Sequence, residues 1–440
     1  MEAFNSYYLV IFLSCIVILS YLYNIIAKRF NIPSVLLLIA SGIVIHQLMG
    51  VLGIPEYNWF PILEVLGIVG LIMIVLEAAL DLELNRKKLP LILKSFSIAF
   101  IGLFASSFLF AYVLQYFLDC EYQNALLYAI PLAVISSAIV IPSVMNLEED
   151  EKEFLVYEGT FSDILGIMFF YFLLGAMEAP EGQNIAGDIA LNVVITVLLS
   201  FILSYILIWV FQKIRSHTKL FLLIAVLILL YSVGKLFHLS SLVIILVFGL
   251  ILNNNKIFFQ GFLSRWVKED AVQNTLINFK VVTLETAFVV RTFFFIIFGI
   301  SITLGNLLSF KVFAISMLIL AIMFALRFVV IRIFERKNIG LKTFIAPRGL
   351  ITVLLFYAIP TTFQIEGFDS GILLYVMLIT AVLMSYSLIR HSKRDVFEEL
   401  VEEAELRVEQ EEGSIVEGAE SSDSDSEENE ASNLDEAKDE

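Results

Sequence analysis

Residues 129–144 read AIPLAVISSAIVIPSV, an apolar run with the character of a membrane span that contains Pro131 and Pro142. A proline inside a helix removes a backbone hydrogen bond and kinks or breaks the helix. Backbone freed in this way is tolerated at membrane depth only where it is buried in protein or lines a cavity. The stretch therefore predicts an interrupted transmembrane helix in the interior of the protein.

A second stretch has the same character far along the chain. Residues 344–360 read FIAPRGLITVLLFYAIP, with Pro347 and Pro360 and with Arg348 beside the first of them. Interrupted spans at corresponding places in two halves indicate a transporter built from inverted repeats. Because proline kinks occur in many membrane helices, further features of the chain must support this interpretation.

The composition excludes an ordinary cytosolic enzyme. Of 440 residues, 59% are hydrophobic and 16% are charged, and the mean hydropathy is +0.89. Soluble domains carry roughly 25% charged residues. Two cysteines and four scattered histidines argue against a disulfide framework and against a metal site built on those residues. We expect no enzyme activity and no cofactor, and a net charge of −16 argues against binding of nucleic acid.

Thirteen apolar runs are candidates for helices that cross a hydrocarbon core of about 30 Å, which needs about 20 residues, and the ninth of them is short. They are residues 5–27, 33–49, 60–82, 90–118, 124–146, 154–177, 185–212, 219–236, 238–252, 282–304, 308–334, 340–363 and 368–390. Runs of this kind must be helical, because an open sheet leaves backbone groups unsatisfied in lipid. The predicted fold is an all-α polytopic membrane protein of about 13 transmembrane helices, with inverted repeats and interrupted crossing helices.

The loops between these runs predict the orientation. If the N-terminus lies outside, nineteen basic residues fall in the inner loops, and the outer loops hold only Lys235 and Lys311. Inner loops of membrane proteins carry such an excess of basic residues. We therefore expect a cell membrane protein, in the plasma or inner membrane, with its C-terminus in the cytoplasm.

The charge also divides the chain into regions. Residues 1–390 are neutral overall, whereas residues 391–440 carry 4 basic and 20 acidic residues. We predict a transmembrane domain at 1–390, an acidic cytoplasmic helix at 391–412 and a disordered acidic tail at 413–440. The amphipathic segment 253–281 is expected to lie along the inner membrane surface.

Ionisable side chains at membrane depth are costly and usually mark a function. Six fall deep within the apolar runs, namely Glu77, Glu158, Asp163, Arg291, Arg327 and Arg348. Asp163 lies near the centre of the sixth run, and Gly159 is one turn before it on the same helix face, which predicts space for an ion or a water. Because a buried carboxylate must be protonated, paired or coordinated, Asp163 is the candidate for binding a cation or a proton. The alternative is a structural pair with an arginine.

Two other deep groups are given structural roles. Glu158 lies about 140° round the helix from Asp163 and needs a different partner. We predict a buried ion pair between Glu158 and Arg291, the alternative being that Glu158 belongs to the ion site. Arg348 is expected to offset helix-end charge in the interrupted twelfth span, or else to form an interhelical pair.

At these residues the chain resembles the monovalent cation/proton antiporters, the family of bacterial and eukaryotic sodium/proton exchangers. The likeness extends over about residues 5–390 and rests on five motifs in order. They are AKRFNIPSVLLLIASGIVI (27–45), LEAALDLEL (76–84), EGTFSD (158–163), RTFFFIIFGISI (291–302) and APRGL (346–350). EGTFSD is similar to the Glu-Ser-x-x-Asn-Asp signature of the electroneutral branch, so Glu158 and Asp163 match its Glu and its last Asp.

The resemblance implies a secondary antiporter in which a cation and a proton compete for one buried carboxylate. Asp163 would be the metal ligand, and Glu77, Ser137 and Ser162 would complete an oxygen shell, with Pro142, Pro347 and Arg348 in the interrupted helices. The chain departs from the family pattern, because Gly159 replaces its Ser, Ser162 replaces its Asn, and SSAIVIP lacks its Thr-Asp pair. With a neutral neighbour at Ser162, one carboxylate would exchange one H+ for one cation.

Several alternatives stay open from the sequence. The exchanged cation could be Na+, Li+ or K+, and SSAIVIP is closer to the Ser-Ser-Thr-Ala run of the potassium-efflux branch. An ion channel would be expected to show a selectivity-filter repeat or regular arginines, and an organic-solute transporter a larger polar lining. The expected partners are the alkali cation, the proton, the lipid bilayer and a second copy of the chain in a homodimer.

Overall fold

The computed structural model describes residues 6–30, 33–52, 60–82, 84, 86–145, 147–178, 185–214, 219–236, 241–259, 269–301, 309–335 and 337–391. Contacts divide the chain into two units, Met1–Ser387 and Leu388–Glu440, and all but the last few of the described residues belong to the first. Apart from His391, the acidic helix predicted at 391–412 and the tail predicted at 413–440 lie outside the described residues.

The regular structure of the described residues is helical, and within these ranges there is no strand. The longer helices are α1 (Ser6–Phe30), α2 (Ser34–Val51), α3 (Phe60–Asp81), α4 (Leu89–Leu118), α5 (Tyr122–Ala133), α6 (Ser137–Ser143), α7 (Glu149–Glu178), α8 (Ile185–Phe211), α9 (Lys219–Leu236), α10 (Ser241–Asn253), α12 (Glu269–Ile300), α13 (Phe310–Phe334), α14 (Ile339–Phe344), α15 (Leu350–Tyr357) and a last helix Gly371–His391. Short turns of helix are η1 (Arg86–Lys88), α11 (Asn255–Phe258) and η4 (Thr361–Phe363). Each of the thirteen predicted runs coincides with one helix or with an interrupted pair.

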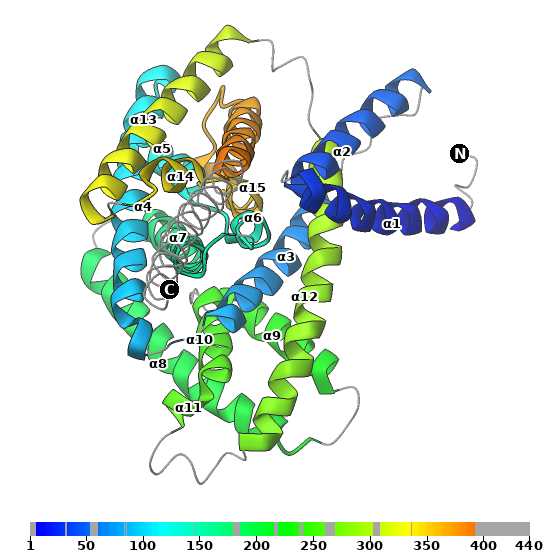
Figure 1. The fold of residues 1–440 in the computed structure, drawn as a ribbon, viewed down its shortest axis with the longest axis vertical. Coiled ribbons are helices and arrows are strands. Elements are labelled where there is room, and N and C mark those ends of the chain that lie inside the picture. The colour runs from blue at the N-terminus through cyan, green and yellow to red at the C-terminus, as the bar shows by residue number, and fades with distance from the viewer. Residues whose placement is uncertain are drawn as a thin grey trace, which may run out of the picture. The chain divides into compact units, whose positions relative to one another are not determined.

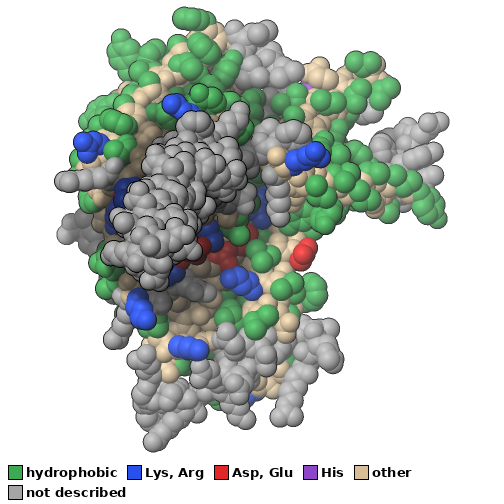
Figure 2. All heavy atoms as spheres, viewed as in Figure 1, with side chains coloured by type: hydrophobic (Ala, Val, Ile, Leu, Met, Phe, Trp, Pro, Cys, Tyr) green, Lys and Arg blue, Asp and Glu red, His purple; other side chains and the backbone are tan. Residues whose placement is uncertain are grey.

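The apolar surface of these helices suits a bilayer. Among the described residues, eight helices are long and apolar enough to cross a membrane. Large apolar side chains point outward along α1, as Val10, Ile18 and Tyr21 do. Figure 2 shows apolar side chains over much of one face, with acidic side chains mainly near its centre and basic ones both there and scattered elsewhere on the face. The predicted all-α membrane fold is confirmed.

The helices pack in two groups (Figure 1). We call α4, α5, α6, α7, α13, α14 and α15 the crossing bundle. Here α4 packs against α5, α7 and α13, the helices α5, α6 and α15 pack against α7, and α14 packs against α13. We call α1, α2, α3, α8, α9, α10 and α12 the flanking bundle, in which α12 packs along α2 and α3, and α10 along α3 and α8. The two bundles meet where α3 contacts α15 and α7 contacts α10.

Glycines set the closest approach within the flanking bundle. A Cβ added to Gly42 of α2 would lie 2.2 Å from the carbonyl oxygen of Ile296, and one added to Gly299 of α12 would lie 2.4 Å from that of Ile39. Small residues allow backbones to pack directly in membrane proteins. Helices α2 and α12 are therefore joined backbone to backbone, and no larger side chain fits at either glycine.

Helix α12 corrects one prediction. The segment 253–281 was expected to lie along the inner surface, but from Glu269 onward it forms the first turns of α12, which is 32 residues long. The segment from 269 to 298 contains neither proline nor glycine, so the helix that begins in polar sequence continues into the apolar run.

Both predicted interruptions exist, one of them at a different place. The second break lies between α14 and α15 and contains Pro347, as predicted. The first break lies at residues 134–136, between α5 and α6, with Val134 and Ser136 in extended conformation. Pro131 is inside α5 and Pro142 is inside α6, so both prolines belong to the interrupted pair of helices, but neither lies at the break.

Candidate functional site

The two breaks touch each other. The backbone N–H of Ser136 donates to the carbonyl oxygen of Pro347 at 2.9 Å. Gly349 lies so close that an added Cβ would be 2.5 Å from the Ser136 hydroxyl oxygen. The interrupted helices therefore cross at their extended segments, and the absence of a side chain at Gly349 permits the crossing.

Three consecutive amides explain where the first helix breaks. Ile135 donates to the hydroxyl oxygen of Ser162, Ser136 to Pro347, and Ser137 to Oδ2 of Asp163, each at 2.9 Å. Each of these N–H groups has a partner outside its own helix, so α5 can end and α6 begin without a lost hydrogen bond. The break is thus fixed by partners on α7 and on the second break, and not by the nearest proline.

Asp163 is a buried carboxylate with an incomplete set of partners. Its exposed fraction is 2%. Oδ2 accepts hydrogen bonds from the backbone N–H and the hydroxyl of Ser137, whereas Oδ1 is buried without a hydrogen-bond partner. Among the described residues, no basic side chain lies within 4.0 Å of it. A buried charge must be paired or neutralised. Oδ1 of this carboxylate is therefore available to a proton or a cation.

The glycines of α7 have a different role from the one expected. A Cβ on Gly159 would lie 3.3 Å from Cα of Ser137, and one on Gly166 would lie 2.2 Å from Cγ2 of Val134. The space beside Gly159 is therefore filled by the first residue of α6, and not by an ion or a water. Both glycines bring α7 against the first break, which is what places Ser137 on Asp163.

Glu158 has another partner than predicted. Arg327 of α13 donates from Nη1 to Oε1 of Glu158 at 2.6 Å and from Nη2 to Oε2 at 2.9 Å. The predicted pair with Arg291 is wrong, because Arg291 belongs to α12 of the flanking bundle, where it lies 3.6 Å from Glu77. Arg327 belongs to the crossing bundle with Glu158, and the bidentate geometry is the strong form of this pair.

The two buried arginines also cap the interrupted helices. Arg327 donates to the carbonyl oxygens of Lys342, Thr343 and Ile345, at and just after the end of α14, at 2.9, 3.1 and 3.0 Å. Arg348 donates to the carbonyl oxygens of Leu132 at 2.7 Å and Ala346 at 3.2 Å. Helix C-termini carry unpaired carbonyls and partial negative charge. Arg348 thus offsets helix-end charge at α5, the other interrupted helix, as well as in its own break.

The predicted oxygen shell is only partly assembled. Ser137 is at Asp163, but the hydroxyl of Ser162 faces the amide of Ile135, and Glu77 pairs with Arg291 across α3 and α12. Sequence reasoning missed Ser136, whose hydroxyl oxygen is buried without a hydrogen-bond partner at the crossing. The adjacent serines of SSAIVIP were the available signal.

A cavity of about 730 Å³ leads to this site from the flanking bundle. Residues of α1, α2, α3, α6 and α12 line it, among them Ser137, Glu77, Asp81 and Arg291. Asp81 is paired with Lys280 at 2.7 Å. The cavity is therefore lined by the ion-paired side chains of Glu77, Asp81 and Arg291 and reaches Ser137, which donates hydrogen bonds to Asp163.

A further group of charges lies at the turn between α13 and α14. Glu335 bonds to Lys94 of α4, and Lys342 of α14 is 3.5 Å from Glu335 and 3.9 Å from Glu151. Burial acts to raise the pKa of Glu335, but the hydrogen bond from Lys94 and the charges of Lys342 and Lys94 outweigh it, so the pKa is lowered from its usual value. These ion pairs lie within the crossing bundle, just as the pair of Glu158 does.

The comparisons with known proteins agree with this geometry. The profile of the family described as "Sodium/hydrogen exchanger, transmembrane" matches residues 13–390. The chain belongs to the sodium/hydrogen exchanger family. The resemblance inferred from its motifs is thereby confirmed. No curated protein sequence gives a significant match.

Solved structures show the same fold for this sodium/hydrogen exchanger. It is similar to the sodium proton antiporter MjNhaP1 from Methanocaldococcus jannaschii at pH 8, with a TM-score of 0.65 and 20% identity over 86% of this chain and 95% of that one. An electron-microscopy structure of the same antiporter gives a TM-score of 0.64 and 18% identity, covering 89% and 96% of the two chains. The fold is that of a multi-pass membrane protein of antiporter type.

Proposed function

We propose that this exchanger moves an alkali cation against protons by binding either one at Asp163. The observation that carries the proposal is the buried Oδ1 of Asp163, which has no hydrogen-bond partner, on a carboxylate without a basic neighbour among the described residues. A proton or a cation neutralises the group, and each excludes the other. Hydroxyl and carbonyl oxygens at the crossing suit a hard cation.

The cavity supports a route to that carboxylate. It ends at Ser137, whose N–H and hydroxyl both donate to Asp163. Its lining includes α6, which belongs to the crossing bundle, while the rest comes from the flanking bundle. We infer that movement of the crossing bundle against the flanking bundle closes this route and opens one on the other side. By loop charge, the cavity faces the cytoplasm.

The stoichiometry follows from which carboxylates already have partners. Glu158 is paired with Arg327, Glu77 with Arg291 and Asp81 with Lys280. Asp163 is left to carry one positive charge at a time, so we propose exchange of one H+ for one cation. We take Na+ as the cation, with K+ as the second candidate because of SSAIVIP, and a homodimer in the cell membrane as the working form.

The test is exchange in proteoliposomes with an imposed pH gradient, comparing NaCl, LiCl, KCl and choline chloride. Dissipation of the gradient by alkali cations and not by choline is expected. Equal dissipation by choline, or uptake of cation without any proton movement, would overturn the proposal in favour of a channel or another transporter.

A further inference from the structure

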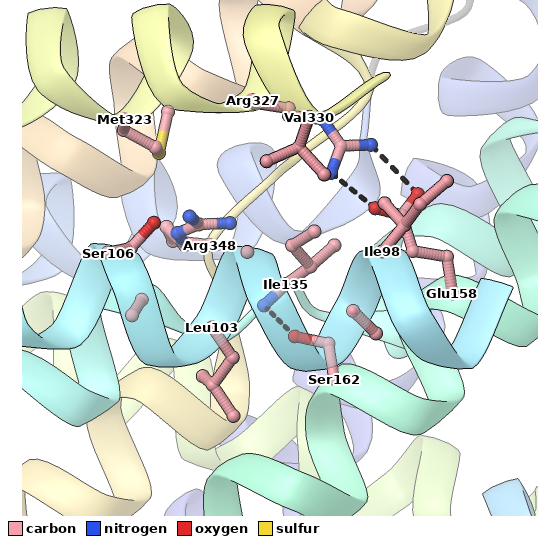
Figure 3. A pocket seen from close by; sticks show the side chains of 13 residues that line it. Ile98, Leu103, Ser106, Ile135, Glu158, Ser162, Met323, Arg327, Val330 and Arg348 are labelled. Atoms are coloured by element: carbon pink, nitrogen blue, oxygen red, sulfur yellow. Dashed lines mark hydrogen bonds and ion pairs between the residues drawn. The ribbon is translucent and has the colours of Figure 1, made fainter. Parts of the chain in front are cut away.

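A second, smaller cavity lies against the face of α7 that carries Glu158 and Ser162, and Asp163 does not line it. Its volume is about 20 Å³, more than the roughly 10–15 Å³ that one water needs. Its polar lining consists of Ser106 of α4, Glu158 and Ser162 of α7, Arg327 and Arg348. Figure 3 shows these side chains in the region between α4, α7 and α13. The cavity has room for one small occupant, such as a water or a monatomic ion.

The charge on this lining is not balanced. Three charged side chains line the cavity, and each is at least nine-tenths buried: Arg327, Arg348 and Glu158. Glu158 uses both oxygens on Arg327. Among the described residues, Arg348 has no carboxylate within 4.0 Å, and no bond joins it to Asp163. The charged side chains of the lining therefore sum to +1 in a buried place. The carbonyl oxygens of Leu132 and Ala346, which Arg348 caps, offset only part of this charge, and the part that is not offset is costly.

The free hydrogen-bonding groups of the lining are mostly donors. A guanidinium has five N–H groups, and two of those of Arg348 donate, to Leu132 and Ala346. The hydroxyl of Ser162 accepts from Ile135, and within the described chain no acceptor takes its hydrogen.

The hydroxyl of Ser106 differs from that of Ser107 in its hydrogen bonding. Ser107 donates to the carbonyl oxygen of Leu103 at 2.8 Å, in the usual manner of a buried helical serine. Ser106 makes no such bond to its own helix, and Figure 3 shows its hydroxyl oxygen turned to the side of α4 on which Arg348 lies. Its hydroxyl is therefore available to an occupant of the cavity.

We propose that this cavity binds one small inorganic anion, of the size of chloride. Such an anion accepts hydrogen bonds from Arg348, Ser106 and Ser162 and cancels the net charge of the lining. An anion suits this lining better than a water, because most of its free groups are donors, both oxygens of Glu158 already accept from Arg327, and a water does not cancel the net charge. The anion is not transported. It neutralises Arg348 in every loading state of Asp163 and so holds the crossing together.

The test uses the purified full-length protein at constant Na+ and ionic strength, with chloride replaced stepwise by gluconate, and with bromide as a second small halide. Thermal unfolding should shift upward in chloride and bromide relative to gluconate, and the shift should saturate with halide concentration. Binding of radioactive chloride gives an independent readout. Neither measurement depends on transport, so the result stands apart from the proposed exchange activity.

Two adjacent serines supply matched variants. Ser106→Ala should raise the half-saturating chloride concentration at least tenfold. Ser107→Ala, at a serine that is also buried on the same helix, should leave it unchanged. Both substitutions suit a helix, so both variants should fold. Identical unfolding in chloride and gluconate would mean a water only, and an unchanged chloride response in Ser106→Ala would place the anion elsewhere. Either result overturns the proposal.

Discussion

Ser136 and Pro347 are joined by a backbone hydrogen bond of 2.9 Å, although 211 positions separate them in the chain. This bond links the two breaks directly. Because Ser137 follows Ser136 and donates to Asp163, and because Arg348 follows Pro347 and caps α5, the proposed ion site and both interrupted helices form one connected unit. We expect them to move together during transport.

Asp163→Asn should abolish exchange while the protein still folds. Asparagine keeps the shape of the side chain but cannot release a proton, so neither coupling ion can be handed over. Proteoliposome exchange should fall at least about 100-fold, the loss expected when a group acting as a proton carrier is removed.

The matched control for this change is Asp81→Asn. Asp81 lines the same cavity but is paired with Lys280, so its variant should still exchange cations. Exchange at the wild-type rate in Asp163→Asn would exclude Asp163 as the carrier.

Glu158→Gln and Arg327→Gln should each destabilise the protein by about 3–5 kcal/mol, because removal of one partner strands a buried charge. Thermal unfolding in detergent measures this loss. Arg291→Gln should cost less, since Arg291 and Glu77 are 3.6 Å apart and line a cavity. A Glu158→Gln variant of full stability but without exchange would instead assign Glu158 to the ion site.

Gly166→Ala should destabilise the protein by about 1–3 kcal/mol, the usual cost of overpacking. The new methyl group would lie 2.2 Å from Cγ2 of Val134 and would push α7 away from the first break. Adding Val134→Ala should restore most of the loss.

Gly175, on the same helix, has no atom within 4 Å of an added Cβ, so Gly175→Ala should be neutral. If Gly166→Ala is also neutral, close contact between α7 and residues 134–136 is not needed for stability.

Exchange should be insensitive to membrane potential. One carboxylate that carries either H+ or one cation moves the same charge in each direction, whereas each uncompensated charge crossing 100 mV is worth about 2.3 kcal/mol. The rate of Na+/H+ exchange can be measured while K+ and valinomycin clamp the potential. A rate that follows the imposed potential would show that a second group, such as Glu77, titrates with Asp163.

Glu335 should contribute to stability at neutral pH and lose that contribution in acid. Its pKa is lowered in the folded protein, so the contribution is present above the unfolded pKa and disappears as the pH falls through the folded value. Glu335→Gln should therefore unfold at a lower temperature than wild type at pH 7, with the gap narrowing below pH of about 4. A gap that does not depend on pH would exclude an ionic role for Glu335.

Much of the fold could be predicted from the sequence because the bilayer imposes simple rules. Among the described residues, apolar runs predicted every long helix, though not the first turns of α12 or short turns such as η1 and α11, and paired prolines located both interrupted spans. Asp163 stood out because it lies in mid-membrane with motif residues around it.

The partner of Glu158 and the position of the first break could not be predicted from the sequence. Arg291 and Arg327 are both deep in apolar helices, and only the packing of α13 with α4 and α14 decides which one meets Glu158. Pro142 pointed to a break, yet the break falls where the amides of Ile135, Ser136 and Ser137 find partners from distant parts of the chain. Both facts depend on contacts between segments that are far apart in sequence.

The ion pairs of Glu77, Asp81, Glu158 and Glu335 are each confined to a single bundle, and this bears on how turnover responds to its surroundings. A sliding step that breaks none of these pairs has to separate apolar surface, such as the contact of Leu354 with Gly67, where an added Cβ would lie 2.9 Å from Cδ2 of Leu354. The barrier to separating such apolar surfaces depends on temperature and on the lateral pressure and thickness of the surrounding lipid. It depends little on salt. The speed of this protein should therefore be set by the membrane that holds it more than by the ionic strength on either side.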